Sequence, residues 1–115
     1  MTKVVEGLVR RLTKAQAQKL AAGATRQRMR HGRILVYRDH IPYVSLLVLE
    51  GTVGFELGRG TRLARSATLE APLVIGQEQV AHRDRFPLTV RALDRVVVCH
   101  LPGGTGRDAT PAGGT

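Results

Sequence analysis

Histidine, cysteine and carboxylate side chains are the groups in this chain that could bind a metal ion or attack a substrate. The chain has four histidines and one cysteine, which are His31, His40, His82, His100 and Cys99. The histidines show neither HxH nor HxxxH spacing, either of which would let two ring nitrogens reach one ion. Cys99 and His100 are neighbours on an expected strand, so their side chains point to opposite faces and cannot share an ion or a proton. Because Ser/His/Asp order, paired-carboxylate spacing and a phosphate-binding loop are also missing, the sequence predicts no metal site and no enzyme.

Basic residues are concentrated in the first third of the chain. Residues 1–33 contain nine lysines and arginines against Glu6 alone, and the whole chain has a net charge of +9. From residue 25 the pattern alternates, so Arg26, Arg28 and Arg30 are expected on one face of a strand. This stripe either binds nucleic acid or an acidic partner, or is a solvated face that protects a strand edge. The candidate contacts are Lys14, Lys19, Arg26, Arg28, Arg30 and Arg33, although no aromatic residues are interleaved with them for base stacking.

Composition indicates one small domain with an aliphatic core. The 115 residues are 43% hydrophobic and include no Trp, two Tyr and two Phe. A single cysteine excludes an internal disulfide and any cysteine-only metal or iron–sulfur site, which fits a reducing compartment. No apolar run approaches the roughly twenty residues that cross a bilayer, and the first residues lack the pattern of a signal peptide. We therefore expect a cytoplasmic location and no membrane association.

The hydrophobic pattern predicts a short helical segment followed by many short strands. Within residues 3–22 apolar residues recur at helical spacing, and Thr13 with Gln16 has the form of a capping box, which indicates two short helices ending near Gly23. After the strand near residue 25, strands are expected at residues 34–37, 44–50, 52–57, 61–65, 68–75, 88–92 and 95–101. The predicted fold is mainly β (α+β), an antiparallel β-roll or jelly roll of about eight strands over residues 1–102. The Gly-, Pro- and Thr-rich tail, residues 103–115, is expected to be disordered.

The order of these elements resembles a known family. Residues 48–57 are two apolar-alternating runs joined at Gly51, where a positive φ lets the chain reverse. They are followed by Ile75-Gly76-Gln77-Glu78 and then by Val90-Arg91-Ala92-Leu93. Over residues 13–102 this order resembles the cyclic nucleotide-binding domain of the catabolite-activator and fumarate-nitrate-reductase (Crp/Fnr) regulator superfamily. The resemblance implies a β-roll and a regulatory role.

The same resemblance implies where a ligand would bind. In this family a Gly-Glu pair precedes a turn that ends in Arg-Ser/Thr-Ala; the Glu binds the ribose hydroxyl and the Arg binds the cyclic phosphate. With residues 90–92 set on the family's closing strand, Gln77 stands at the Glu position and Phe86-Pro87-Leu88 stands at Arg-Ser/Thr-Ala. A buried phosphate needs a fixed cation and backbone donors, and Pro87 has no N–H.

These departures predict a degenerate site that has lost cyclic-nucleotide binding. The residues expected to line the remaining pocket are Gly76, Gln77, Glu78, Arg83, Arg85 and Thr89. The alternative is a shifted loop, in which Arg85, one position early, and Glu78, one position late, still supply a cation and a carboxylate.

The resemblance also bears on the segment after the roll. Family regulators continue into a long helix that covers the nucleotide and forms the dimer, and then into a DNA-binding helix-turn-helix; nothing helical is expected here after Leu101. The sequence therefore predicts a stand-alone regulatory or sensor-type domain that acts through a protein partner or another small ligand. The alternative is a small basic protein that binds nucleic acid.

Overall fold

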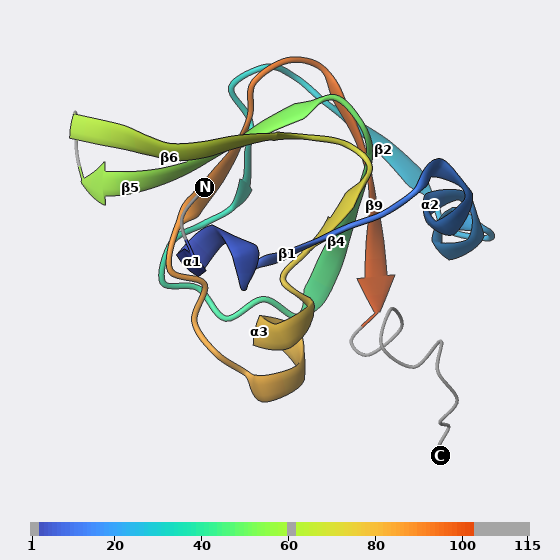
Figure 1. Ribbon diagram of the computed structural model, residues 1–115, viewed down its shortest axis with the longest axis horizontal. Helices are drawn as coiled ribbons and strands as arrows, with labels where there is room; N and C mark the ends of the chain where they lie inside the picture. The colour runs from blue at the N-terminus through green and yellow to red at the C-terminus, as the bar shows by residue number, and fades with distance from the viewer. Residues whose placement is uncertain (1–2, 60–61, 103–115) are drawn as a thin grey trace.

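The computed structural model describes residues 3–59 and 62–102. Within these residues the chain forms three short helices and nine strands (Figure 1). The helices are α1 (Lys3–Glu6), α2 (Lys14–Ala21) and α3 (Gln77–His82). The strands are β1 (Val9–Arg11), β2 (Arg26–Met29), β3 (Ile34–Val36), β4 (Val44–Glu50), β5 (Thr52–Arg59), β6 (Arg62–Glu70), β7 (Leu73–Ile75), β8 (Thr89–Ala92) and β9 (Val96–Pro102). This confirms the predicted fold class, mainly β with a short N-terminal helical segment; the tail expected to be disordered lies outside the described residues.

The strands pair into two antiparallel sheets. Sheet A has the order β1-β7-β4-β9-β2, and sheet B has the order β3-β8-β5-β6. Several neighbours in the sheets are far apart in sequence: Arg28 on β2 lies opposite Val97 on β9, for example. Figure 1 shows the β5–β6 hairpin projecting from one side of the roll, whereas α2 lies on the opposite side, next to β2 and β9. The roll thus brings the basic first third of the chain beside the last strand.

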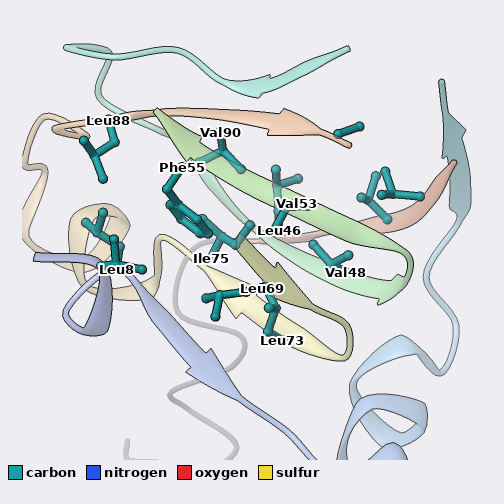
Figure 2. Close-up of a cluster of buried hydrophobic side chains, with 14 of the residues drawn as sticks. Leu8, Leu46, Val48, Val53, Phe55, Leu69, Leu73, Ile75, Leu88 and Val90 are labelled. Carbon is teal, nitrogen blue, oxygen red and sulfur yellow. The ribbon is translucent and has the colours of Figure 1, made fainter. Parts of the chain in front are cut away.

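The core lies between the two sheets. Phe55 and Phe86 are its largest side chains, and both are fully buried. Figure 2 shows Phe55, Val90 and Leu88 converging with aliphatic side chains from β4 and β7. Both tyrosines are in contrast exposed, with 54% of Tyr37 and 91% of Tyr43 accessible to solvent. Each buried Phe contributes about 1.5–3 kcal/mol relative to an exposed one, so the two phenylalanines are major contributors to folding.

A second apolar cluster covers the outer face of sheet A. Strand side chains alternate between the two faces, so Leu47, Val74 and Cys99 point away from the main core. They pack against Ala17 and Ala21, the two buried residues of α2. The helix begins as the sequence predicts: the Thr13 hydroxyl accepts from the Gln16 N–H, and the Gln16 side chain accepts from the Thr13 N–H. This reciprocal capping box fixes the start of α2 against the sheet.

Three local predictions were wrong in detail. Between the two N-terminal helices the chain forms β1, because Val9 to Arg11 pair with β7 and this pairing outweighs helical spacing. The strands predicted at residues 61–65 and 68–75 are instead β6 and β7, separated at Ala71-Pro72, since a proline cannot donate to the ladder. The helix α3 was not predicted; it is only 6 residues long, and Gly76 is its N-cap.

The β4–β5 reversal at Gly51 is as predicted. Its φ is +101°, and an added Cβ would lie 2.5 Å from a Val96 methyl and 2.6 Å from the Arg95 carbonyl oxygen. The Asp94 carboxylate accepts the Thr52 N–H at 2.8 Å. The reversal is therefore packed tightly on the turn between β8 and β9, which fixes where Arg95 lies.

None of the helices in the described ranges is long and apolar enough to span a membrane.

Candidate functional site

The residues expected to bind a ligand begin at the junction of β7 and α3. Gly76 is buried, has a φ of +87° and donates its N–H to the Leu8 carbonyl at 2.9 Å. A side chain would be strained at this φ, so the glycine is required by the backbone. The Phe86 ring is the nearest neighbour of an added Cβ, at 3.8 Å. The family's glycine position is thus retained, but it faces a phenylalanine.

Gln77 and Glu78 turn toward the N-terminal segment. Both line a hollow of about 230 Å³ between α3 and the α1–β1 turn. Within the described residues, the buried Gln77 amide nitrogen has no hydrogen-bond partner. The exposed Glu78 carboxylate lies 3.2 Å from the His82 Nε2 on the next turn of α3. Where the sequence alignment expects a ribose-binding Glu, the chain has an amide beside the α1–β1 turn.

Phe86 fills the place that the resemblance assigns to the phosphate-binding arginine. It is completely buried, and Leu88 two residues later is 4% exposed in the same cluster. Both backbone polar groups of Phe86 are already hydrogen-bonded. The Asp39 N–H donates to the Phe86 carbonyl at 2.7 Å, and the Phe86 N–H donates to the His40 carbonyl at 2.8 Å. Two such bonds hold the α3–β8 loop on the β3–β4 loop. The interior at this position is apolar and packed.

The two arginines of the α3–β8 loop lie on the outside. The Arg85 guanidinium is exposed and donates to the Asp39 carbonyl at 2.8 Å. Arg83 ends α3 with a left-handed φ of 56° and, with Val80, lines a different hollow of about 430 Å³ beside residues 41–43. Thr89 is half-buried on β8, opposite Glu56. The six predicted pocket residues are thus at one end of the roll but do not face a common cavity.

One buried charge was not among the predicted site residues. Glu56 is 4% exposed, and the Arg91 Nε donates to both of its carboxylate oxygens, at 3.1 and 3.2 Å. Arg91 also donates to the Gly32 carbonyl at 2.9 Å, which connects β8 to the β2–β3 turn. This charge-assisted hydrogen bond is bifurcated, with one N–H shared between the two carboxylate oxygens, and it pairs the buried carboxylate with a cation. The sequence offered no signal for it, because the pairing depends on the register of β5 and β8.

The basic residues of the first third are only partly gathered. Arg26 and Arg28 lie on β2 opposite Cys99 and Val97, on the outer face of sheet A, as the alternation predicts, but Arg30 was wrongly predicted to share this strand face because β2 ends at Met29. Lys14 from α2 lies close by, and Arg26 donates to the Gln18 side chain at 3.2 Å. Two hollows, of about 480 and 270 Å³, lie on this face. The remaining candidates line neither of them; they are Lys19, Arg30 and Arg33. Arg95, which does line one, was missed by the sequence because it belongs to the distant β8–β9 turn.

Cys99 and His100 behave as their positions on a strand predict. Cys99 is completely buried, whereas His100 is exposed. Burial raises the pKa of the Cys99 thiol above its ordinary value of 9.0, and the positive charge of Arg26 lowers it by a smaller amount. The neutral thiol is thus the form that the fold favours, as expected for a small core side chain.

Comparison with known proteins identifies the fold. No protein-family model and no curated protein sequence matches the chain. A transcriptional regulator from Thermotoga maritima superposes with a TM-score of 0.69 at 21% identity, over 80% of this chain and 73% of that one. A cyclic nucleotide-binding-like protein from Brucella abortus gives 0.67 at 17% identity, over 92% and 88%. The catabolite activator protein of Thermus thermophilus gives 0.64 at 16% identity, over 82% of this chain and 45% of that one.

These superpositions show that the chain has the β-roll of cyclic nucleotide-binding domains. The resemblance stated from the sequence is thus confirmed as a resemblance of fold.

Proposed function

We propose that this domain is regulatory, that it does not bind a cyclic nucleotide at the position its fold family uses, and that it acts by binding a partner. The observation that supports this proposal most is the complete burial of Phe86. When residues 90–92 are aligned with the closing strand, Phe86 stands where the resemblance calls for a cation.

A phosphate at this position would have nothing to stabilise it. Moving an anion out of water costs several kcal/mol unless a fixed cation and hydrogen-bond donors replace the solvent. Here the buried neighbours are apolar, and the Phe86 N–H already donates to the His40 carbonyl. Pro87 supplies no donor at all.

Arg85 does not substitute for the missing arginine. Its guanidinium is outside the core and bonded to the Asp39 carbonyl, so an inward rotation would break that bond and bury an unpaired charge. The bond also joins the same two loops that the Phe86 backbone joins. Arg85 therefore keeps this end of the roll closed.

Isothermal titration calorimetry with cyclic AMP and cyclic GMP tests this proposal. We expect no saturable heat at micromolar ligand, for the wild type and for Arg85→Ala alike. Arg83→Ala is the matched control, because it removes a neighbouring arginine that is not bonded to Asp39. A micromolar dissociation constant that is lost in Arg85→Ala and kept in Arg83→Ala would contradict the proposal and support a shifted binding loop.

A second candidate function is nucleic-acid binding through the basic first third of the chain. The supporting observation is that Arg26 and Arg28 share one exposed face with Lys14 nearby. If these residues bind phosphates, affinity for duplex DNA falls steeply with salt, and each contact removed reduces the slope of log affinity against log salt by about one. Weak binding without this dependence would exclude the candidate.

A further inference from the structure

A groove crosses the outer face of sheet A, between α2 and the β8–β9 turn. It consists of two hollows of about 480 and 270 Å³. Arg26 and Glu50 line both of them, so the hollows adjoin each other. In Figure 1 this is the side of the molecule where α2 lies next to β2 and β9. We call it the α2–β2 groove.

The walls of the α2–β2 groove carry an excess of positive charge. Lys14, Arg26, Arg28 and Arg95 line it, against the single carboxylate of Glu50. In the part of the chain that the structure describes, none of these four cations forms an ion pair with a carboxylate. Four cations against one carboxylate leave an excess of positive charge, which attracts an anionic partner and gives the surrounding surface a positive potential.

The backbone that carries the cations is ordered, and the side chain of one of them is itself held by a hydrogen bond. Arg26 is bonded to Gln18 of α2, and Arg28 is on the paired strand β2. The position of Arg95 is fixed by the turn in which Asp94 accepts the Thr52 N–H. Because the supporting backbone is already ordered, a partner that binds these side chains pays less conformational entropy.

The floor of the groove is apolar, and none of the described residues that line it is aromatic. Its half-buried members include Leu49, Ala71, Pro72 and Val97. Nucleic acid would find the cations but no ring on which a base could stack. A polypeptide with carboxylates and an aliphatic residue would use both features, since its apolar side chain would be removed from water on the floor. The groove therefore matches an acidic peptide better than a nucleic acid.

From these observations we infer that the α2–β2 groove is the docking site for an acidic, partly aliphatic segment of a partner protein. This inference rests on the proposed function, because it specifies the chemistry of the partner through which the domain acts.

The test is fluorescence anisotropy with a labelled oligo-glutamate peptide that carries interspersed leucines. Three variants are compared with the wild type. The groove variant combines Arg26→Gln, Arg28→Gln and Arg95→Gln. The matched control combines Lys19→Gln, Arg30→Gln and Arg33→Gln, which removes the same charge from exposed positions that do not line the groove. Glu50→Gln removes the one acidic side chain of the groove.

The groove variant is expected to lose peptide affinity by tenfold or more, about 1.4 kcal/mol, and the control to change far less. Glu50→Gln is expected to bind a few times more tightly, a gain that unfolding cannot produce. Equal losses in the groove variant and the control would overturn the inference, because the effect would then be one of net charge. It would also be overturned if the wild type does not bind the peptide at about 1 mM, or if a leucine-free peptide binds equally well.

Duplex and single-stranded DNA are titrated in parallel. Tighter binding to DNA than to the peptide, reduced in both triple variants, would favour the nucleic-acid function and overturn the inference. Cyclic AMP titrated into the same preparations reports separately on the proposed function. Absence of specific peptide binding would contradict the inference about the groove, whereas binding of cyclic AMP would contradict the proposed function, so the two failures are distinguishable.

Discussion

Replacing Phe86 by alanine tests whether the ring at the expected phosphate-binding position contributes to the stability of the fold. The ring is completely buried in the main core, so its removal loses the transfer free energy of the ring and leaves a cavity. For such a change the unfolding free energy decreases by about 3–5 kcal/mol. Domains of this size have about 5–15 kcal/mol in total, so the variant is expected to lose between about a fifth of its stability and all of it. The melting temperature should fall by roughly 12 °C or more.

Arg85→Ala is the matched change one residue earlier. Within residues 3–59 and 62–102 its exposed guanidinium makes one hydrogen bond, to the Asp39 carbonyl, and such a bond contributes about 1 kcal/mol. Urea unfolding followed by far-ultraviolet circular dichroism measures both variants, and equal m values show that the unfolded states are comparable. The reasoning is refuted if Phe86→Ala costs about as little as Arg85→Ala, since the ring would then not be supporting the core.

Three further predictions concern the scaffold. Gly51→Ala should cost about 1–3 kcal/mol, because the positive φ is retained and the new methyl meets the Val96 side chain and the Arg95 carbonyl oxygen; a neutral effect in urea unfolding would show that the turn relaxes. Thr13→Ala should cost about 1 kcal/mol through loss of the α2 cap, and Thr13→Ser should restore most of it. The raised pKa of Cys99 means that the fold keeps a proton which the unfolded chain releases, so the unfolding free energy should fall as pH rises above 9.0. Cys99→Ala should lack the part of this decrease that comes from the thiol. If the unfolding free energies of the two proteins change in parallel with pH, the thiol does not cause the decrease.

The elements that sequence predicted best are those determined by local chemistry. The Thr13–Gln16 capping box and the reversal at Gly51 depend on residues that are close in sequence, and both are present. The strand β1 and the helix α3 were missed because tertiary contacts determine them. The first pairs with β7, and the second is a short segment whose start is defined by Gly76.

The candidate ligand site was also predictable only where neighbours in sequence determine it. Aligning the closing strand was enough to place Phe86 where an arginine is expected, but only the structure gives its burial and the bond between Arg85 and Asp39. Arg95 could not be predicted as part of a basic groove, because its nearness to Arg28 results from the pairing of β2 with β9. The sequence suggested a set of basic contacts between residues 14 and 33. In the structure only some of these residues line the groove, and Arg95 joins them.

The most direct test of the central claim is an amide proton–nitrogen NMR titration of the wild-type protein with cyclic AMP. At about 1 mM ligand, even a site of about −4 kcal/mol would be half occupied, so weak binding would be visible. We predict that the amide signals of Gly76, Gln77, Phe86 and Leu88 do not move. Saturable shifts at these four residues would show that the ligand enters beside Phe86 and would contradict the account.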